Sequence, residues 1–265
     1  MNVEAAFVTS AASAAGFPRA DLPEIALIGR SNVGKSSLIN ALVRQRVART
    51  SAAPGKTRLA NIYRVVRGAS SPLLLVDLPG YGYARGGSGS VLEFAELTRG
   101  YFERDIRLQP GVQPLRRERR PTPALSARPS TGSGRAVDGP GTTDAGSAIA
   151  ALLLVDTRHP GLPSDIEAWH WLQSVVERCS IVATKIDKLT RGERIRALGE
   201  LQSVFVDPVL PVSAVTGEGL DELWKLIDKL ANTRSPNPRN PSSPAPTAPL
   251  PLRKSPTARP GRRRS

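Results

Sequence analysis

The chain has 265 residues, of which 40% are hydrophobic and 23% are charged, and its formal net charge is +14. A single cysteine, Cys179, excludes an intrachain disulfide and favours an intracellular protein. The first residues lack the pattern of a signal peptide, and no run reaches the roughly 18 apolar residues of a membrane span, so we expect a cytoplasmic protein without a membrane span.

Two segments, 108–147 and 232–265, are predicted to be disordered. The first contains 6 Pro, 6 Gly, 8 Ser or Thr and no aromatic residue among its 40 residues, and the second contains 9 Pro and no acidic residue. Such compositions bury too little apolar surface to offset the entropy of ordering. The sequence therefore predicts an N-terminal extension over 1–23, one α/β domain over 24–231 that the 108–147 insert interrupts, and a C-terminal tail.

Most of the positive charge lies in these two segments. The tail has 8 basic and no acidic residues, the insert has 6 basic and 3 acidic residues, and the rest of the chain has 23 basic and 20 acidic residues. A basic arm outside a nearly neutral domain is typical of a segment that contacts a polyanion. A tail that only keeps the protein dissolved is the alternative, and composition leaves both readings open.

Short apolar runs alternate with helical patterns along the remaining 191 residues. This alternation predicts βα units around a mostly parallel sheet. Capping-box patterns at Ser164–Glu167 and Thr190–Glu193 predict two helix starts, and an apolar face that includes Leu223 and Ile227 predicts the last helix. Six strands are expected, at 24–29, 59–66, 72–77, 150–156, 180–185 and 208–214.

The stretch "GRSNVGKSS", Gly29–Ser37, lies between the first of these strands and a helical pattern. It matches G-x-x-x-x-G-K-[ST], in which backbone N–H groups surround phosphate oxygens. Lys35 would reach the β and γ phosphates, Ser36 would bind Mg²⁺, and the helix N-terminus would add a positive dipole end. The flanking strand and helix favour this phosphate loop over an ordinary glycine-rich turn.

A second motif, "DLPG", follows the strand predicted at 72–77. Asp77 would hold the metal through water, and the Gly80 amide would bond the γ phosphate only while that phosphate exists. Between the two motifs, "SAAPGKTRL" offers Thr57 as a further hydroxyl ligand of Mg²⁺, with Ser51 and Thr50 as alternatives.

The base would be bound by "TKID", Thr184–Asp187, at the end of the fifth predicted strand. The Asp187 carboxylate can accept from N1–H and the 2-amino group of guanine, a donor pair that adenine lacks, while the Lys185 stem lies over the ring. A backbone amide of "VSA", Val212–Ala214, would meet the guanine O6. Four motifs in this order predict a guanine nucleotide and leave a nucleoside kinase or ATPase as a remote alternative.

These motifs together resemble the EngB (YsxC/YihA) family of bacterial GTPases, in the TrmE–Era–EngA–YihA–Septin-like superfamily. The resemblance covers roughly Phe7 to Leu230 without 108–147, an insert that the family lacks. It is carried by "PEIALIGRSNVGKSSLINAL", "PGKTRLANIY", "LLLVDLPGYGYA", "LLLVDTRHP", "IVATKIDKL" and "PVSAVTGEGLDELW". It implies a Ras-like P-loop GTPase with a six-stranded, mostly parallel sheet and helices on both faces, which assists assembly of the large ribosomal subunit and is required for normal cell division and septation.

The resemblance and the motifs together give a set of site residues. Predicted metal ligands are Ser36, Thr57 and Asp77, and predicted catalytic residues are Lys35, Thr57, Gly80 and Asn32. The predicted nucleotide contacts are Gly29, Arg30, Ser31, Asn32, Val33, Gly34, Lys35, Ser36, Gly55, Lys56, Thr57, Arg58, Leu59, Asp77, Leu78, Pro79, Gly80, Thr184, Lys185, Ile186, Asp187, Val212, Ser213 and Ala214.

Tyr81 stands where many GTPases have a glutamine that orients the attacking water. We therefore expect slow intrinsic hydrolysis of GTP and a role as a timed switch. Asn32 either holds K⁺, as related GTPases with this residue do, or only supports the loop backbone. Besides GTP and GDP, the expected partners of this monomer are the large ribosomal subunit precursor and its rRNA, with no DNA. The alternative is a nearly non-catalytic GTP sensor in cell division that acts through a protein partner without RNA.

Overall fold

The computed structural model describes residues 2–18, 22–49, 59–81, 96–104 and 149–232. The segment 108–147 and all but the first residue of 232–265 lie outside these ranges, so the disorder predicted for them stays a prediction. The loop that contains Gly55 to Arg58 also lies outside these ranges, so its predicted nucleotide contacts stay predictions.

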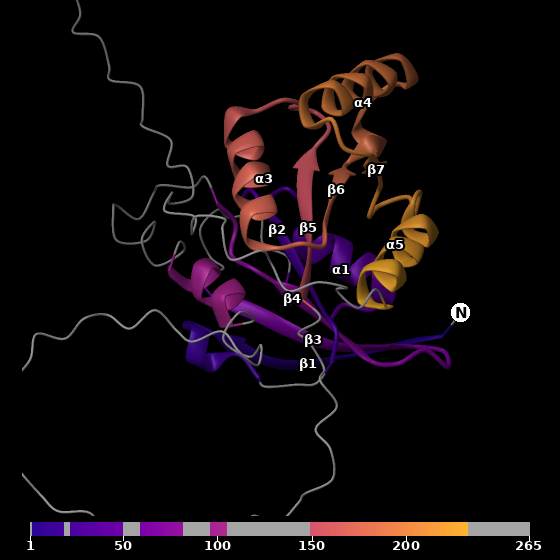
Figure 1. Cartoon of the computed structure of the whole chain (residues 1–265). Coiled ribbons are helices and arrows are strands. Elements are labelled where there is room, and N and C mark those ends of the chain that lie inside the picture. The colour runs from indigo at the N-terminus through magenta and orange to yellow at the C-terminus, as the bar shows by residue number, and fades with distance from the viewer. Residues whose placement is uncertain (1, 19–21, 50–58, 82–95, 105–148, 233–265) are drawn as a thin grey trace, which may run out of the picture.

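A single sheet of seven strands forms the centre of the described structure (Figure 1). Its strand order is β1-β3-β4-β2-β5-β6-β7. The pairs β1–β3 and β3–β4 are antiparallel, and the other pairs are parallel. The strands are β1 (Val3–Ala11), β2 (Glu24–Gly29), β3 (Ala60–Arg67), β4 (Leu73–Asp77), β5 (Ile149–Asp156), β6 (Cys179–Thr184) and β7 (Val209–Pro211).

All six predicted strands are confirmed, with ends within one residue of the prediction except at β7, which stops at Pro211, three residues early. Every residue of β2, β4 and β5 is buried, as expected for strands covered on both faces. The strand count, however, was one too low. The additional strand, β1, lies within the predicted N-terminal extension and pairs with β3.

The sequence of β1 gave no strand signal because its burial does not alternate. Only its terminal residues, Val3 and Ala11, are buried, and the register shifts between Phe7 and Thr9. An edge strand with a bulge shows neither the alternating nor the continuous apolar pattern on which strand prediction depends.

Helices cover both faces of the sheet, as predicted. One face packs against α1 (Lys35–Val43) and α5 (Leu220–Asn232). The other packs against α3 (Pro163–Val175), α4 (Arg191–Phe205) and the helical residues 96–104. Figure 1 shows α1 and α5 on one side of β5 and β6, and α3 on the other.

One of the two predicted capping boxes is present. Thr190 caps α4, where its hydroxyl accepts from the Glu193 N–H and the Glu193 carboxylate accepts from the Thr190 N–H at 2.8 Å. The helix predicted there is present, but the box at Ser164–Glu167 is wrong, because α3 begins at Pro163 with Leu162 as its N-cap, two residues before Ser164, and has no side-chain cap bond. A proline already has the backbone angle of a first helical residue, so it starts α3 without a polar cap.

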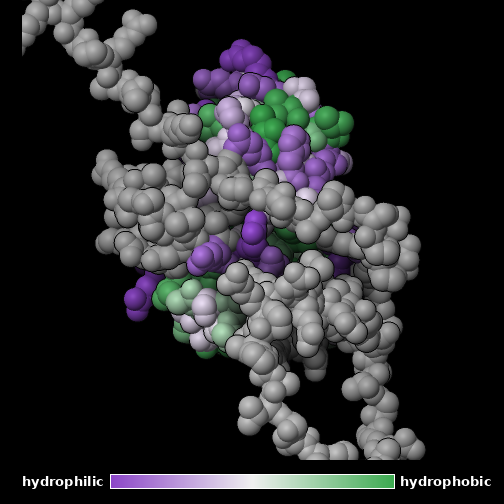
Figure 2. All heavy atoms as spheres, turned by 60° about the vertical axis from the view of Figure 1, so that its left-hand side comes forward, coloured by the Kyte–Doolittle hydropathy of each residue, from purple (hydrophilic) through white to green (hydrophobic). Residues whose placement is uncertain are grey.

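Single apolar side chains are exposed near one end of the molecule. Figure 2 shows hydrophobic and hydrophilic residues mixed at the top, at the height that α4 occupies in Figure 1. Ile195 in α4 is 65% exposed, and Val206, directly after α4, is 88% exposed. Scattered exposure of this kind is ordinary on protein surfaces, and we assign it no role. None of the helices in the described ranges has the length and apolar character required to cross a membrane.

Candidate nucleotide-binding site

The phosphate loop joins the carboxyl end of β2 to the first residue of α1. Gly34 has a left-handed backbone with φ of 113° and caps α1, and Asn32 has φ of 63°. A Cβ atom on Gly29 would lie 2.7 Å from the Leu154 carbonyl oxygen of β5. The loop therefore requires small or left-handed residues at these positions, and it sets the α1 N-terminus at the edge of the sheet.

Lys35 begins α1 and is only 8% exposed. Its Nζ donates to the carbonyl oxygens of Gly29 at 3.1 Å and Arg30 at 3.4 Å. Burial lowers the pKa of Lys35, and the nearby Asp77 carboxylate opposes this shift. The amine thus lies under the loop, where a phosphate of a bound nucleotide would pair with it.

Ser36 and Asp77 bring two oxygen ligands together beside the loop. The Ser36 hydroxyl donates to Asp77 Oδ2 at 2.6 Å, and Asp77 is 2% exposed. Among the described residues its other oxygen, Oδ1, has no hydrogen-bond partner. Burial raises the pKa of Asp77, with Lys35 and Ser36 acting against it. A buried, unpartnered carboxylate oxygen next to a hydroxyl fits Mg²⁺ or a water bound to it.

Gly80 touches the phosphate loop so closely that no larger residue fits. A Cβ atom there would lie 2.6 Å from the Ser31 backbone nitrogen. On either side of this contact, the Ser31 N–H donates to the Tyr81 carbonyl at 3.1 Å and the Tyr81 N–H donates to the Gly29 carbonyl at 3.3 Å. The first residues of the switch segment are therefore fixed on the loop, with Leu78 buried beneath them.

The segment Thr184–Asp187 lies at the carboxyl end of β6, next to the phosphate loop. The Thr184 hydroxyl donates to the Val33 carbonyl at 2.8 Å. Lys185 has a left-handed backbone with φ of 62°, and its Nζ donates to the Asn32 carbonyl at 2.6 Å and to Asp156 Oδ2 at 2.9 Å. Lys185 thus spans from β6 to the loop, where its stem can cover a bound base.

Asp187 lies beside the segment that follows β7. Its Oδ1 accepts from the Ser213 hydroxyl at 2.7 Å, and its Oδ2 lies 3.3 Å from Lys188 Nζ. Burial raises the pKa of Asp187, but the hydrogen bonds from Ser213 and Lys188 outweigh it and hold the pKa below its usual value. The Ser213 hydroxyl also accepts from the backbone N–H groups of Val215 and Thr216.

Ser213 therefore has a side-chain role that the sequence did not indicate, because the prediction used 212–214 only for a backbone amide.

Asp156 was missed as well. It ends β5, and its carboxylate accepts from Arg158 and Lys185. Burial raises its pKa, but these hydrogen bonds lower it to about 2. An aspartate at the end of an apolar strand, the same signal that identified Asp77, could have found it.

The structure brings the described part of the predicted site together at one edge of the sheet. Residues 29–36, 77–80, 184–187 and 212–214 meet there through the contacts given above. Gly55, Lys56, Thr57 and Arg58 lie outside the described residues, so their predicted contacts stay predictions. Leu59 is described and lies 41% exposed directly before β3.

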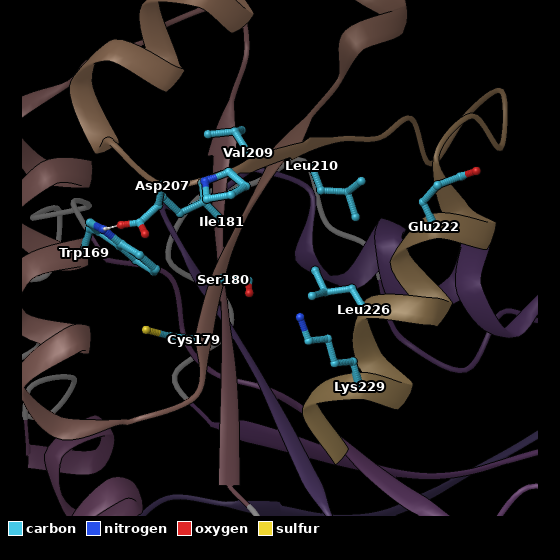
Figure 3. A pocket seen from close by; sticks show the side chains of 11 residues that line it. Trp169, Cys179, Ser180, Ile181, Asp207, Val209, Leu210, Glu222, Leu226 and Lys229 are labelled. Atoms are coloured by element: carbon cyan, nitrogen blue, oxygen red, sulfur yellow. Dashed lines mark hydrogen bonds between the residues drawn. The ribbon is translucent and has the colours of Figure 1, made fainter. Parts of the chain in front are cut away.

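A separate cavity of about 340 Å³ lies between the start of β6, the β7 strand and α5. Figure 3 shows Leu226 and Lys229 on α5 facing β6, and Asp207 hydrogen-bonded to Trp169. The cavity includes Cys179 and Ser180 at the start of β6, whereas the nucleotide motifs follow the end of that strand. It is therefore not part of the nucleotide site.

The fold and the motifs at the sheet edge define a P-loop GTPase, a class that uses Mg²⁺ with GTP. Residues 24–106 match the family described as "50S ribosome-binding GTPase". In addition, a crystal structure of Era from Aquifex aeolicus bound to GDP·AlF4⁻ is similar, with a TM-score of 0.54 and 19% identity over 81% of this chain and 58% of that chain. At this identity the likeness shows a shared fold.

The chain belongs to the EngB family. It is 35% identical to the probable GTP-binding protein EngB of Koribacter versatilis over 239 residues, which cover 89% of this chain and 98% of the relative. The EngB of Solibacter usitatus is 35% identical over 234 residues, which cover 88% of this chain and 99% of the relative. A crystal structure of a probable EngB protein has a TM-score of 0.51 and 20% identity over 80% of this chain and all of that chain. The protein is accordingly a GTPase.

Proposed function

We propose that this GTPase is a slowly hydrolysing switch in the cytoplasm that assists assembly of the large ribosomal subunit. The observation that carries the proposal is the match of residues 24–106 to a 50S ribosome-binding GTPase family, together with EngB relatives over almost the whole chain. In its GTP state the protein docks on a precursor particle and its rRNA, and in its GDP state it leaves. Defects in division and septation follow when ribosome production fails.

The site supports this proposal through a division of roles among its residues. Lys35 would bind the β and γ phosphates, Ser36 and Thr57 would hold Mg²⁺ with Asp77 acting through water, and Gly80 would bind the γ phosphate through its amide. The metal supplies positive charge that neutralises the phosphates. Asp187 binds the base, because its carboxylate, whose pKa lies below the usual value, is ionised at neutral pH and can accept from two guanine donors.

The slow rate is supported by the direction of the Tyr81 side chain. Tyr81 is 3% exposed, and its hydroxyl donates to Asp165 Oδ1 at 2.8 Å in the core. A side chain buried in this way does not reach a water on the phosphate side of the loop. Hydrolysis then depends on charge placed around the phosphates, by a cation or by a partner.

For the cation, we propose K⁺ bound beside the phosphates by the Asn32 side chain. Asn32→Gly removes the amide and tolerates the left-handed backbone at φ of 63°. GTP turnover at fixed ionic strength is expected to be faster in KCl than in NaCl, and the variant should lose this difference while it still binds GDP. Equal wild-type rates in the two salts would show that Asn32 binds no K⁺ and only supports the loop backbone. The hydrogen bond from Lys185 Nζ to the Asn32 backbone carbonyl is one contact through which it does so.

For the basic tail, we propose contact with rRNA phosphates. Residues 233–265 carry 8 basic residues, and their removal leaves α5 complete. This truncation should not change nucleotide affinity. Particle binding should weaken, and the slope of its log–log salt dependence should fall by about 0.7 to 0.9 for each phosphate that the tail neutralises. Identical salt slopes for the full and truncated proteins would show that the tail does not bind the particle.

Depletion of the protein from its host cell tests the proposed function. We expect large-subunit precursors to accumulate on sucrose gradients before division slows. A septation defect with unchanged ribosome profiles would contradict the proposal. That result would favour the alternative, a nearly non-catalytic GTP sensor that acts in division through a protein partner.

A further inference from the structure

A buried hydrogen-bonded cluster connects the phosphate loop, the first switch residues and α3. The Tyr81 hydroxyl donates to Asp165 Oδ1 at 2.8 Å. The Arg30 Nε donates to Asp165 Oδ1 at 3.1 Å and to Oδ2 at 3.2 Å. One carboxylate thus joins a residue of the phosphate loop to the residue that follows Gly80.

The position of Asp165 in the fold favours a carboxylate that is paired with donors. Asp165 is 1% exposed in the first turn of α3, where an acidic residue is favoured by the helix dipole. Burial raises the pKa of the Tyr81 hydroxyl well above its usual value, and the Asp165 charge adds to this, so the hydroxyl remains a donor. A buried carboxylate is costly unless it is paired, so Arg30 and Tyr81 both favour this arrangement.

The backbone of the same residues forms the contact between switch and loop. Arg30 and Tyr81 form a parallel β-bridge, and the Gly80 backbone lies directly against Ser31. The Tyr81 side chain is thus anchored in the core one residue after the Gly80 amide, at the point where the switch contacts the phosphate loop.

We propose that Asp165 is a positioning residue of this GTPase, which holds the Gly80 amide in place for the γ phosphate through Tyr81 and Arg30. The inference rests on the proposed role of Gly80 as the group that binds that phosphate. Tyr81 thereby acquires a function of its own, since it fixes the switch at the position where a glutamine would orient water.

A preformed position of the Gly80 amide affects the affinity only of a nucleotide that contacts this amide. GTP binding benefits because the Gly80 amide need not be ordered when the γ phosphate arrives. GDP has no γ phosphate and gains nothing from this order. Weakening the cluster should consequently lower affinity for GTP and leave affinity for GDP unchanged.

The chain offers a matched control in a second cluster of the same chemistry. The Tyr101 hydroxyl donates to Glu24 Oε2 at 2.8 Å, and Arg104 also bonds this carboxylate. Tyr101 is fully buried, and Glu24 begins β2, at the end of that strand opposite the phosphate loop. Tyr101→Phe thus removes an equivalent bond from the core without touching the nucleotide site.

The test compares the dissociation constants of GDP and a non-hydrolysable GTP analogue for the full chain in Mg²⁺. Tyr81→Phe should reduce the preference for the GTP analogue over GDP about tenfold relative to wild type, which equals about 1.4 kcal/mol. Asp165→Asn, which removes the shared acceptor charge, should reduce it at least as far, and Tyr101→Phe should keep the wild-type preference.

An unchanged preference in folded Tyr81→Phe protein would overturn the inference, and so would an equal loss in Tyr101→Phe, which would indicate general destabilisation. Should Tyr81→Phe not fold, Asp165→Asn decides the same question. Failure of the wild type to bind the GTP analogue would instead refute the proposed function, so the two failures are distinct.

Discussion

Asp187→Asn is expected to weaken GTP binding by about 2–5 kcal/mol and to shift preference toward xanthosine triphosphate. The loss arises because the carboxylate accepts from two guanine donors, and an amide cannot accept from both. Xanthine has a carbonyl at C2, which can accept from the new amide. Ser213 favours this outcome, since its hydroxyl can still donate to the remaining Oδ1 and hold the side chain in position.

Competition of GTP, xanthosine triphosphate and ATP against labelled GDP measures this change in specificity. Asp207→Asn is a suitable control, because Asp207 bonds Trp169 and Gln173 away from the nucleotide motifs. That variant should keep the wild-type order of affinities. Undiminished GTP binding by Asp187→Asn would refute the assignment of the base-reading residue.

Gly80→Ala is expected to slow GTP hydrolysis by about 10²–10³-fold, the usual effect of losing one positioned amide donor. The added Cβ would lie 2.6 Å from the Ser31 nitrogen and 2.7 Å from its Cα. Both are backbone atoms, so the switch must move off the loop. GDP should still bind, because its contacts lie on the phosphate loop and the base-reading segments.

Single-turnover hydrolysis and GDP affinity, measured on the same preparation, test this prediction. Gly199→Ala in α4 is the matched control, since its added Cβ meets nothing within 4 Å apart from its own helical backbone. It should hydrolyse GTP at the wild-type rate and gain about 0.5–1 kcal/mol of stability. A Gly80→Ala protein that hydrolyses GTP at the wild-type rate would contradict the position given to the Gly80 amide.

The sequence predicted those elements whose structure is determined by residues that are consecutive in the chain. The strands β2, β4 and β5 are continuous apolar runs because both faces are covered. "GRSNVGKSS" and "DLPG" begin at the last residue of β2 and of β4, respectively. The Thr190 capping box needs only four consecutive residues, so it too was predictable. In each case the residues that determine the structure are neighbours in the chain.

Two of the features that were missed, β1 and the ion pair of Asp165, depend on contacts between distant residues. Strand β1 exists through its pairing with β3, not through an apolar pattern of its own. Asp165 lies 135 residues after Arg30, so its ion pair with the phosphate loop has no local signal. The capping box predicted for Ser164 and Glu167, on either side of Asp165, fits the local sequence but not the helix start at Pro163.

Co-sedimentation with large-subunit precursors tests most directly whether the protein is a ribosome-assembly switch. Full-length protein would be loaded with a non-hydrolysable GTP analogue or with GDP and centrifuged with large-subunit precursors and, separately, with small subunits. We expect the analogue-loaded protein to travel with the large-subunit precursors and the GDP-loaded protein to stay near the top of the gradient. Analogue-loaded protein that stays at the top with every particle, while it binds nucleotide normally, would contradict the account.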